Sequence, residues 1–150
     1  SPLTGRALAM ASVPDPVFAS GAMGKGVAVD PTVGKVFAPF DGKVVTVLPS
    51  KHAVGLISSD GVELLIHVGI DTVQLKGEHY TSHVTAKLQV KKGDLLLEFD
   101  IAAIKAAGYS TVTPVIVTNS KKYSDVLPAP VTKVSAGEDI LAAVTLAAVK

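Results

Sequence analysis

Cysteine is absent from the 150 residues of the chain. This absence excludes disulfide bonds, zinc sites built from thiolates and thiol nucleophiles, and it leaves the redox environment undetermined. Charged residues are also scarce, at 18%, and the formal net charge is +1 with lysine and arginine scattered. Because aromatic residues make up only 5%, the basic surface with stacking side chains that nucleic acid requires is not expected. Any chemistry must use histidine, carboxylates, hydroxyls, lysine or the backbone.

Long apolar runs are missing too, although hydrophobic residues account for 48% of the chain. Proline, glycine or a charge interrupts each apolar stretch before the roughly 18 residues that a membrane-spanning helix needs. An initiator methionine and a signal-peptide pattern are likewise missing. The length suits one domain with a real core. We therefore expect residues 1–150 to form a single domain that does not insert into a membrane and is excised from a longer protein.

Valine recurs two positions apart in short segments, as at Val27 and Val29 and again at Val115 and Val117. A period of two is the pattern of β-strands. Glycine, proline and Asp-Gly pairs separate these segments at intervals typical of an antiparallel sandwich or barrel.

One alanine-rich stretch, Asp100–Ala107, favours a short helix because Asp100 can cap its start and Gly108 can end it. The prediction is an all-β protein: an antiparallel β-sandwich or barrel of many short strands, with one or two short helical turns.

The reactive groups are four histidines, of which His52 and His67 flank one predicted hairpin with Asp60-Gly61 at its turn. Side chains in paired strands alternate between faces, so a loop with an even number of residues brings the two imidazoles together. A three-residue loop without a bulge would separate them. Since Asp-Gly favours a two-residue turn, we expect both rings on one face.

An imidazole with a pKa near 6.5 is largely neutral at physiological pH and can serve as nucleophile, base or metal ligand. The apolar neighbours Val54, Leu65 and Ile66 would further favour the uncharged form. A second ring could donate a hydrogen bond to charge that builds up on a transferred group. At this point a purely structural role for the pair is an equal alternative.

Other polar residues give weaker signals. Gly69 allows close approach of a backbone or partner near His67. Asp71 could add a carboxylate, although aspartate before threonine at a strand end more often forms a turn or cap. His79 and His83 are spaced for metal only on a helix, and the β-rich context predicts solvated positions.

The segments 51–56 and 61–77 resemble the signature of the glucose-type enzyme IIA domain of the bacterial phosphoenolpyruvate-dependent sugar phosphotransferase system. The similarity continues through 15–18, 24–29, 38–44 and 113–115 and covers essentially the whole chain. Residues 98–109, 118–120 and 123–128 are similar to the β-glucoside, sucrose and trehalose branch. In that branch the IIA domain usually ends a longer IICBA permease.

The resemblance implies a phosphoryl carrier without a cofactor. His67 would take the phosphoryl group on Nε2 from the phosphocarrier protein HPr and pass it to a cysteine of a IIB domain, in the same chain or a separate one. The carbonyl of Gly69 would orient His67 through Nδ1. His52 would hydrogen-bond the phosphoryl group, Ser50 would support His52, and Asp71 would lie at the rim.

The resemblance also implies an apolar depression in which partners dock. Its residues would be Val17, Phe18, Met23, Leu48, Val54 and Leu65. The domain would be cytoplasmic and tethered to the inner face of the membrane through fused IIB and IIC domains. The sugar is not identified, because the IIC domain selects it.

Two alternatives belong to other classes. One is a standalone regulatory IIA domain that binds permeases or kinases, against which the β-glucoside-like C-terminal part argues. The other is a zinc hydrolase, because His67 and Asp71 resemble the His-x-x-x-Asp motif of lysostaphin-like peptidases. Those enzymes need a further His-x-His motif, which this chain lacks. Incidental zinc at His52 and His67 stays open.

Overall fold

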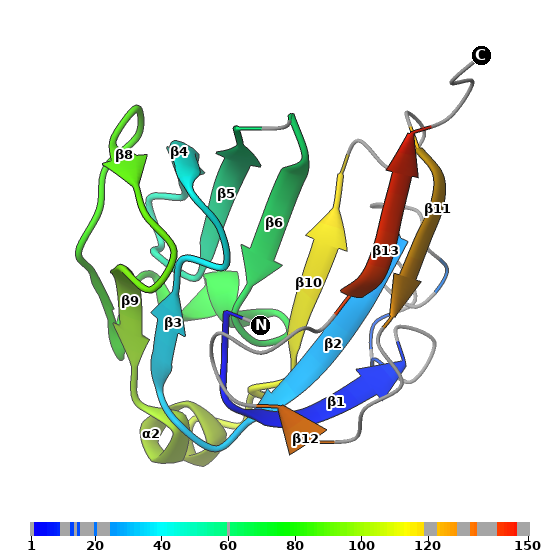
Figure 1. The fold of residues 1–150 in the computed structure, drawn as a ribbon. Coiled ribbons are helices and arrows are strands. Elements are labelled where there is room, and N and C mark those ends of the chain that lie inside the picture. Colours follow the sequence, from blue (N-terminus) through cyan, green and yellow to red (C-terminus); the bar gives the residue numbers. More distant parts are fainter. Residues whose placement is uncertain are drawn as a thin grey trace.

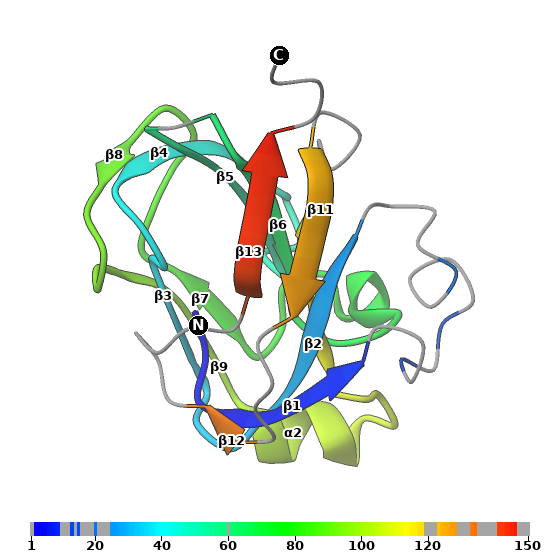
Figure 2. The same ribbon diagram turned by 45° about the vertical axis from the view of Figure 1, so that its right-hand side comes forward.

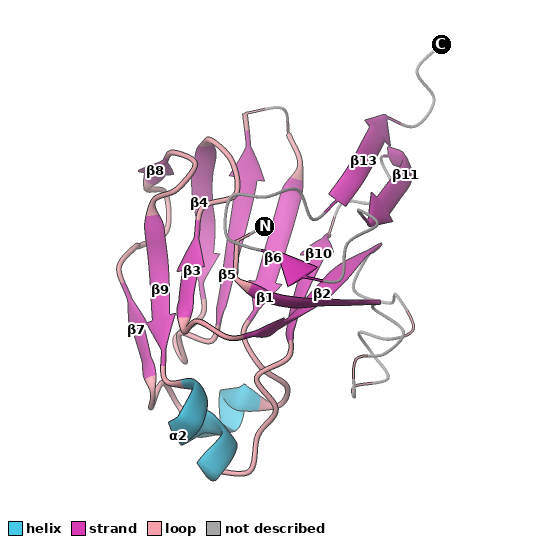
Figure 3. Ribbon diagram, turned by 60° about the horizontal axis from the view of Figure 1, so that its bottom comes forward, coloured by secondary structure: helices cyan, strands magenta, loops and turns pink. Residues whose placement is uncertain are grey.

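A computed structural model describes residues 2–9, 13, 15, 20, 25–59, 61–118, 123–128, 133–134 and 141–146. Short strands dominate this part of the chain, as the colouring of Figure 3 shows. The strands are β1 (Gly5–Ala9), β2 (Lys25–Pro31), β3 (Lys35–Phe37), β4 (Gly42–Val47), β5 (Ala53–Ser58), β6 (Glu63–His67), β7 (Tyr80–Ser82), β8 (Gln89–Val90), β9 (Leu95–Phe99), β10 (Thr113–Val117), β11 (Tyr123–Pro128), β12 (Lys133–Val134) and β13 (Leu141–Leu146). The helices are the 3₁₀ helix η2 (Thr72–Leu75) and α2 (Ile101–Ala106).

The strands form three antiparallel sheets. The largest has eight strands in the order β12-β1-β2-β10-β6-β5-β4-β8, and a second has the order β3-β9-β7. The pair β11-β13 lies beside β2 (Figures 1 and 2). The predicted all-β class with antiparallel strands and short helical turns is confirmed. No helix in the described ranges is long and apolar enough to cross a membrane.

The main core lies between the eight-stranded and the three-stranded sheet. Leu56 of β5 and Ile66 of β6 bury their side chains in one cluster with Val36 of β3 and Leu97 of β9. Burial of such side chains removes apolar surface from water, worth about 2 kcal/mol for each large residue. The two sheets are therefore held together by their facing apolar surfaces.

A smaller apolar cluster covers the other face of the large sheet. Leu65 points to it, while its neighbours Leu64 and Ile66 point to the main core. His67 follows Leu65 by two positions, so strand alternation directs its side chain to the Leu65 face. The buried residues of this second cluster are Val13, Ala28, Ile70 and Ile116.

The predicted helix is present. The carboxylate of Asp100 accepts a hydrogen bond from the Ala103 N–H at 3.0 Å, which caps α2 at its start. Ile104 is the buried residue that anchors the helix to the core. Gly108 adopts a left-handed φ of +92° just after the helix ends.

The turn between β5 and β6 differs from the expected even loop. Ala53 lies opposite His67, and the Ser58 N–H donates to the Val62 carbonyl at 2.9 Å, so the loop comprises the three residues 59–61. Gly61 closes it with a φ of +90° and donates its N–H to the Ser58 carbonyl at 3.0 Å. The expectation of a two-residue turn was wrong, because a glycine after aspartate also suits the left-handed last position of a three-residue loop.

Candidate functional site

His52 and His67 are nevertheless in contact, with ring centroids 4.7 Å apart and ring planes at 79°. His67 is the last residue of β6, whereas His52 precedes β5. The alternation of side chains between the faces of a strand therefore does not determine the direction of His52. Lys51 turns the chain there with a left-handed φ of +62°, and the Val68 N–H bonds the His52 carbonyl at 2.6 Å. The expected pair is present, but a bend before the strand creates it rather than the hairpin register.

The hydrogen bond of His67 assigns its tautomer, and the hydrogen bond of His52 is compatible with the opposite tautomer. Nδ1 of His67 lies 2.7 Å from the carbonyl oxygen of Gly69, which can only accept. Nδ1 therefore carries the proton, and Nε2 carries the lone pair. Nδ1 of His52 lies 2.5 Å from Oγ of Ser50, a hydroxyl that can donate. When this hydroxyl donates, Nδ1 of His52 accepts, and its Nε2 carries a proton that can be donated.

Both imidazoles are neutral at physiological pH. Burial, and the neighbouring His67, lower the pKa of His52 to about 4. Burial also lowers the pKa of His67, against the opposing effects of its hydrogen bond to Gly69 and of the Asp15 and Asp71 carboxylates. A neutral imidazole with its lone pair on Nε2 thus lies beside a second neutral imidazole.

Gly69 presents its carbonyl to His67 because of its own left-handed φ of +87°. A Cβ at this position would lie 2.4 Å from Cγ2 of Thr72 and 2.8 Å from the carbonyl oxygen of Ser110. The next peptide unit is fixed as well, since the Ile70 N–H donates to the Ser110 carbonyl at 3.1 Å. Only glycine fits this position without displacement of the backbone.

Sequence reasoning missed the residues that surround this glycine. Thr72, Tyr80 and Ser110 lie behind the backbone of residues 68–70 and bond to it. The available signal was a glycine two positions after a histidine, which indicates an unusual backbone but not its neighbours.

The expected docking residues have different surroundings. Leu48 follows β4 and is 37% exposed, Leu65 is half-buried, and Asp71 is exposed with a φ of +59°. Leu48 also lines a shallow pocket of about 460 Å³ together with Ser50, which supports His52.

One docking residue is corrected. Val54 is only 1% exposed and belongs to the main core, because β5 is flanked by β4 and β6 and faces the three-stranded sheet. It cannot contact a partner in this structure. Three expected docking residues lie outside the described residues: Val17, Phe18 and Met23.

The other histidines lie on no helix. His79 is exposed with a φ of +73°, and Nε2 of His83 lies 3.7 Å from the carboxylate of Glu98. Within the described ranges, no three histidine, aspartate or glutamate side chains are grouped to hold a metal ion. His52 and His67 would supply two ligands to a metal, fewer than the three protein ligands of a catalytic zinc site.

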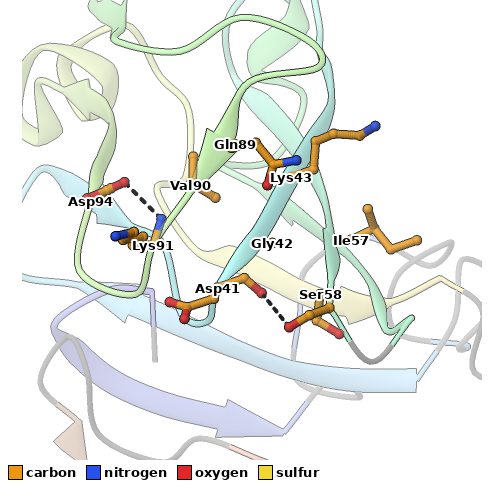
Figure 4. A pocket seen from close by; sticks show the side chains of 10 residues that line it. Asp41, Gly42, Lys43, Ile57, Ser58, Gln89, Val90, Lys91 and Asp94 are labelled. Atoms are coloured by element: carbon orange, nitrogen blue, oxygen red, sulfur yellow. Dashed lines mark hydrogen bonds between the residues drawn. The ribbon is translucent and has the colours of Figure 1, made fainter.

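A second pocket, of about 600 Å³, lies where Gly42 pairs with Ser58, at the end of β4 and β5 remote from His52 (Figure 4). Its two carboxylates bond the backbone of the turn after β8. Asp41 accepts from the Lys92 N–H at 2.8 Å, and Asp94 accepts from the N–H of Lys91 at 2.9 Å. These carboxylates stabilise a turn, and we assign the pocket no chemistry.

Comparisons with known proteins agree with the expected family. The sequence model of the family described as "phosphoenolpyruvate-dependent sugar phosphotransferase system, EIIA 1" matches residues 1–123. β-Glucoside-specific EIIBCA components are 48% identical over 141 residues in Halalkalibacterium halodurans and 52% identical over 136 residues in Dickeya chrysanthemi. These alignments cover 94% and 91% of this chain, which spans only 22% of each relative.

The fold has a counterpart among solved structures. The glucose permease IIA from Mycoplasma capricolum superposes with a TM-score of 0.84 at 34% sequence identity. The superposition covers 94% of this chain and 91% of that one. The chain therefore belongs to the EIIA 1 family of the phosphoenolpyruvate-dependent sugar phosphotransferase system.

Proposed function

We propose that this chain is the phosphoryl carrier of a β-glucoside-type sugar permease, with His67 as the residue that carries the group. The supporting observation is the neutral imidazole pair, in which Nδ1 of His67 donates to Gly69 and Nε2 holds the lone pair. The EIIBCA relatives support the type of permease.

In the first step, the lone pair on Nε2 of His67 attacks the phosphorus atom of phospho-HPr. The P–N bond to the HPr imidazole breaks, and its electron pair stays on that ring. In the second step, the thiolate of a IIB cysteine attacks phosphorus, and the electron pair of the breaking bond returns to Nε2 of His67. The Nδ1 proton stays on the ring throughout, and the carbonyl of Gly69 stabilises the positive charge that develops there.

His52 acts on the transferred group rather than on the nucleophile. Its Nε2 proton can bond a phosphoryl oxygen, while the Ser50 hydroxyl holds the opposite side of the ring. Because the site is largely buried, such a fixed donor stabilises charge more than it would in water. Transfer of a phosphoryl group depends mainly on this kind of positioning and charge stabilisation.

The partners dock around the histidines. We place HPr and IIB in turn over Leu48, Leu65 and the rim residue Asp71, with Val17, Phe18 and Met23 as further contacts. The IIB and IIC domains belong to the same polypeptide, as in the EIIBCA relatives, and hold this domain on the cytoplasmic side of the membrane.

The test is phosphorylation of the chain by phosphoenolpyruvate, enzyme I and HPr, followed by mapping of acid-labile phosphate. We expect label on His67 and none in His67→Ala. Label that persists in the variant, or that maps to another residue, would contradict the assignment.

A further inference from the structure

Two buried hydroxyls converge on one backbone carbonyl next to His67. The Oγ1 of Thr72 donates to the Val68 carbonyl oxygen at 2.7 Å, and the hydroxyl of Tyr80 donates to the same oxygen at 2.9 Å. Val68 and Thr72 are fully buried, and Tyr80 is 5% exposed. Both lone pairs of this carbonyl are thus occupied by side chains.

The position of this carbonyl determines the geometry of the next one. Val68 C=O and Gly69 N–H belong to one planar peptide unit, and Gly69 C=O and Ile70 N–H belong to the following unit. The two hydroxyls fix the first plane, while the Ser110 carbonyl fixes the second through Ile70. The Gly69 carbonyl, which accepts from His67, is consequently held from both sides.

Tyr80 reaches this point from the other sheet. It begins β7 and lies opposite Phe99 of β9, with the two rings stacked at 6.4 Å between centroids. Burial raises the pKa of Tyr80, so its hydroxyl remains protonated and able to donate. The three-stranded sheet thereby contributes a rigid donor behind the histidine of the eight-stranded sheet.

We propose that Tyr80 is a positioning residue for phosphoryl transfer: with Thr72, it fixes the peptide of Val68 and Gly69 and thereby the carbonyl that holds the Nδ1–H tautomer of His67. This inference rests on the proposed function. Tyr80 acts without touching the phosphoryl group, through the backbone of residues 68 and 69.

The competing explanation is that the hydroxyl of Tyr80 only satisfies a buried carbonyl. The variant Tyr80→Phe distinguishes this structural role from the positioning role. Thr72 still satisfies the Val68 carbonyl in the variant, while one of the two restraints on the peptide plane of Val68 and Gly69 is lost. Tyr109→Phe is the matched control, since it removes a hydroxyl from a partly buried tyrosine that packs against the same core. Thr72→Val is compared with Thr111→Val, because the Thr111 hydroxyl has no hydrogen-bond partner in the part of the chain described.

The first readout is the tautomer of His67, measured by ¹⁵N NMR of the imidazole in the 150-residue chain. We expect the Nδ1–H form in the wild type and a several-fold larger Nε2–H fraction in Tyr80→Phe and Thr72→Val. The second readout is phosphoryl uptake from phospho-HPr. Loss of one restraining hydrogen bond should slow it on the order of fivefold. The phospho-HPr concentration for half-maximal rate should not change, and both control variants should behave as wild type.

An unchanged tautomer and rate in Tyr80→Phe, with a lower melting temperature alone, would overturn the positioning role. An equal loss of rate in Tyr109→Phe would also overturn it. If Tyr80→Phe does not fold, the tautomer and the uptake rate of Thr72→Val decide whether the peptide of Val68 and Gly69 positions His67. A wild-type chain that takes no phosphate on His67 overturns the proposed function instead, while the tautomer comparison still decides whether Tyr80 positions the ring.

Discussion

At the scale of single residues, the site depends on a backbone conformation that favours glycine. Gly69 turns its carbonyl toward His67, and its neighbours Thr72 and Ser110 leave no space for a Cβ. The hydrogen bond to this carbonyl decides which nitrogen of His67 carries the lone pair. The identity of a residue without a side chain therefore sets the chemistry of the histidine two positions before it.

Gly69→Ala should consequently destabilise the fold and disorder the acceptor of His67. We expect a loss of at least about 2 kcal/mol in the free energy of unfolding, measured with urea. Gly61→Ala is the matched control, because Gly61 has a similar φ of +90° but open space where a Cβ would lie. Gly61→Ala should lower the free energy of unfolding by only about 1 kcal/mol. Equal losses in the two variants would contradict the steric explanation.

The burial of His52 predicts a pH dependence of stability. Its pKa is about 4 in the folded chain, below the ordinary 6.5, so the unfolded state binds the extra proton. The contribution of neutral His52 is complete above pH 6.5 and is lost as the pH falls from 6.5 to 4, by on the order of 3 kcal/mol. Urea unfolding across this range measures it. His52→Gln should flatten the profile, and an unchanged slope in the variant would exclude His52 as its cause.

At the scale of elements, sequence patterns predicted the strands and the helix better than the loops. The period of two and the cap at Asp100 are local properties that tertiary contacts did not override. The Asp60-Gly61 dipeptide was ambiguous, since glycine suits both two- and three-residue loops. The burial of Val54 could not be predicted either, because it depends on a sheet formed by residues far along the chain.

Because Val54 is buried and Leu48 is exposed, substitutions at these two residues should separate effects on stability from effects on docking. Val54→Ala should reduce the free energy of unfolding by about 2 kcal/mol and leave affinity for HPr unchanged, since the side chain is buried in β5. Leu48→Ala should weaken HPr binding with little effect on stability, because the side chain is exposed at the end of β4. Urea unfolding and calorimetric titration measure the two effects. The reverse pattern would contradict the placement of the docking surface.

At the scale of the whole molecule, the proposed function requires two partners to reach one pair of histidines in turn. His52 is expected to matter more for release of the phosphoryl group than for its capture, because in the proposed function it bonds the phosphoryl oxygens rather than the nucleophile. His52→Gln should still accept phosphate on His67 but transfer it to a IIB domain at least about tenfold more slowly. Single-turnover transfer from the phosphorylated chain measures this rate. Unimpaired transfer would refute the companion role of His52.

The two imidazoles belong to one hairpin, whereas Tyr80 comes from a strand of another sheet. Even so, Tyr80 is 12 residues from Val68 and Thr72 is four residues from it, whereas His52 and His67 are 15 residues apart, so none of these contacts closes a long loop. The histidine pair and the hydrogen bonds that fix the Val68 carbonyl should therefore form at similar loop-closure cost, without either one waiting for the other.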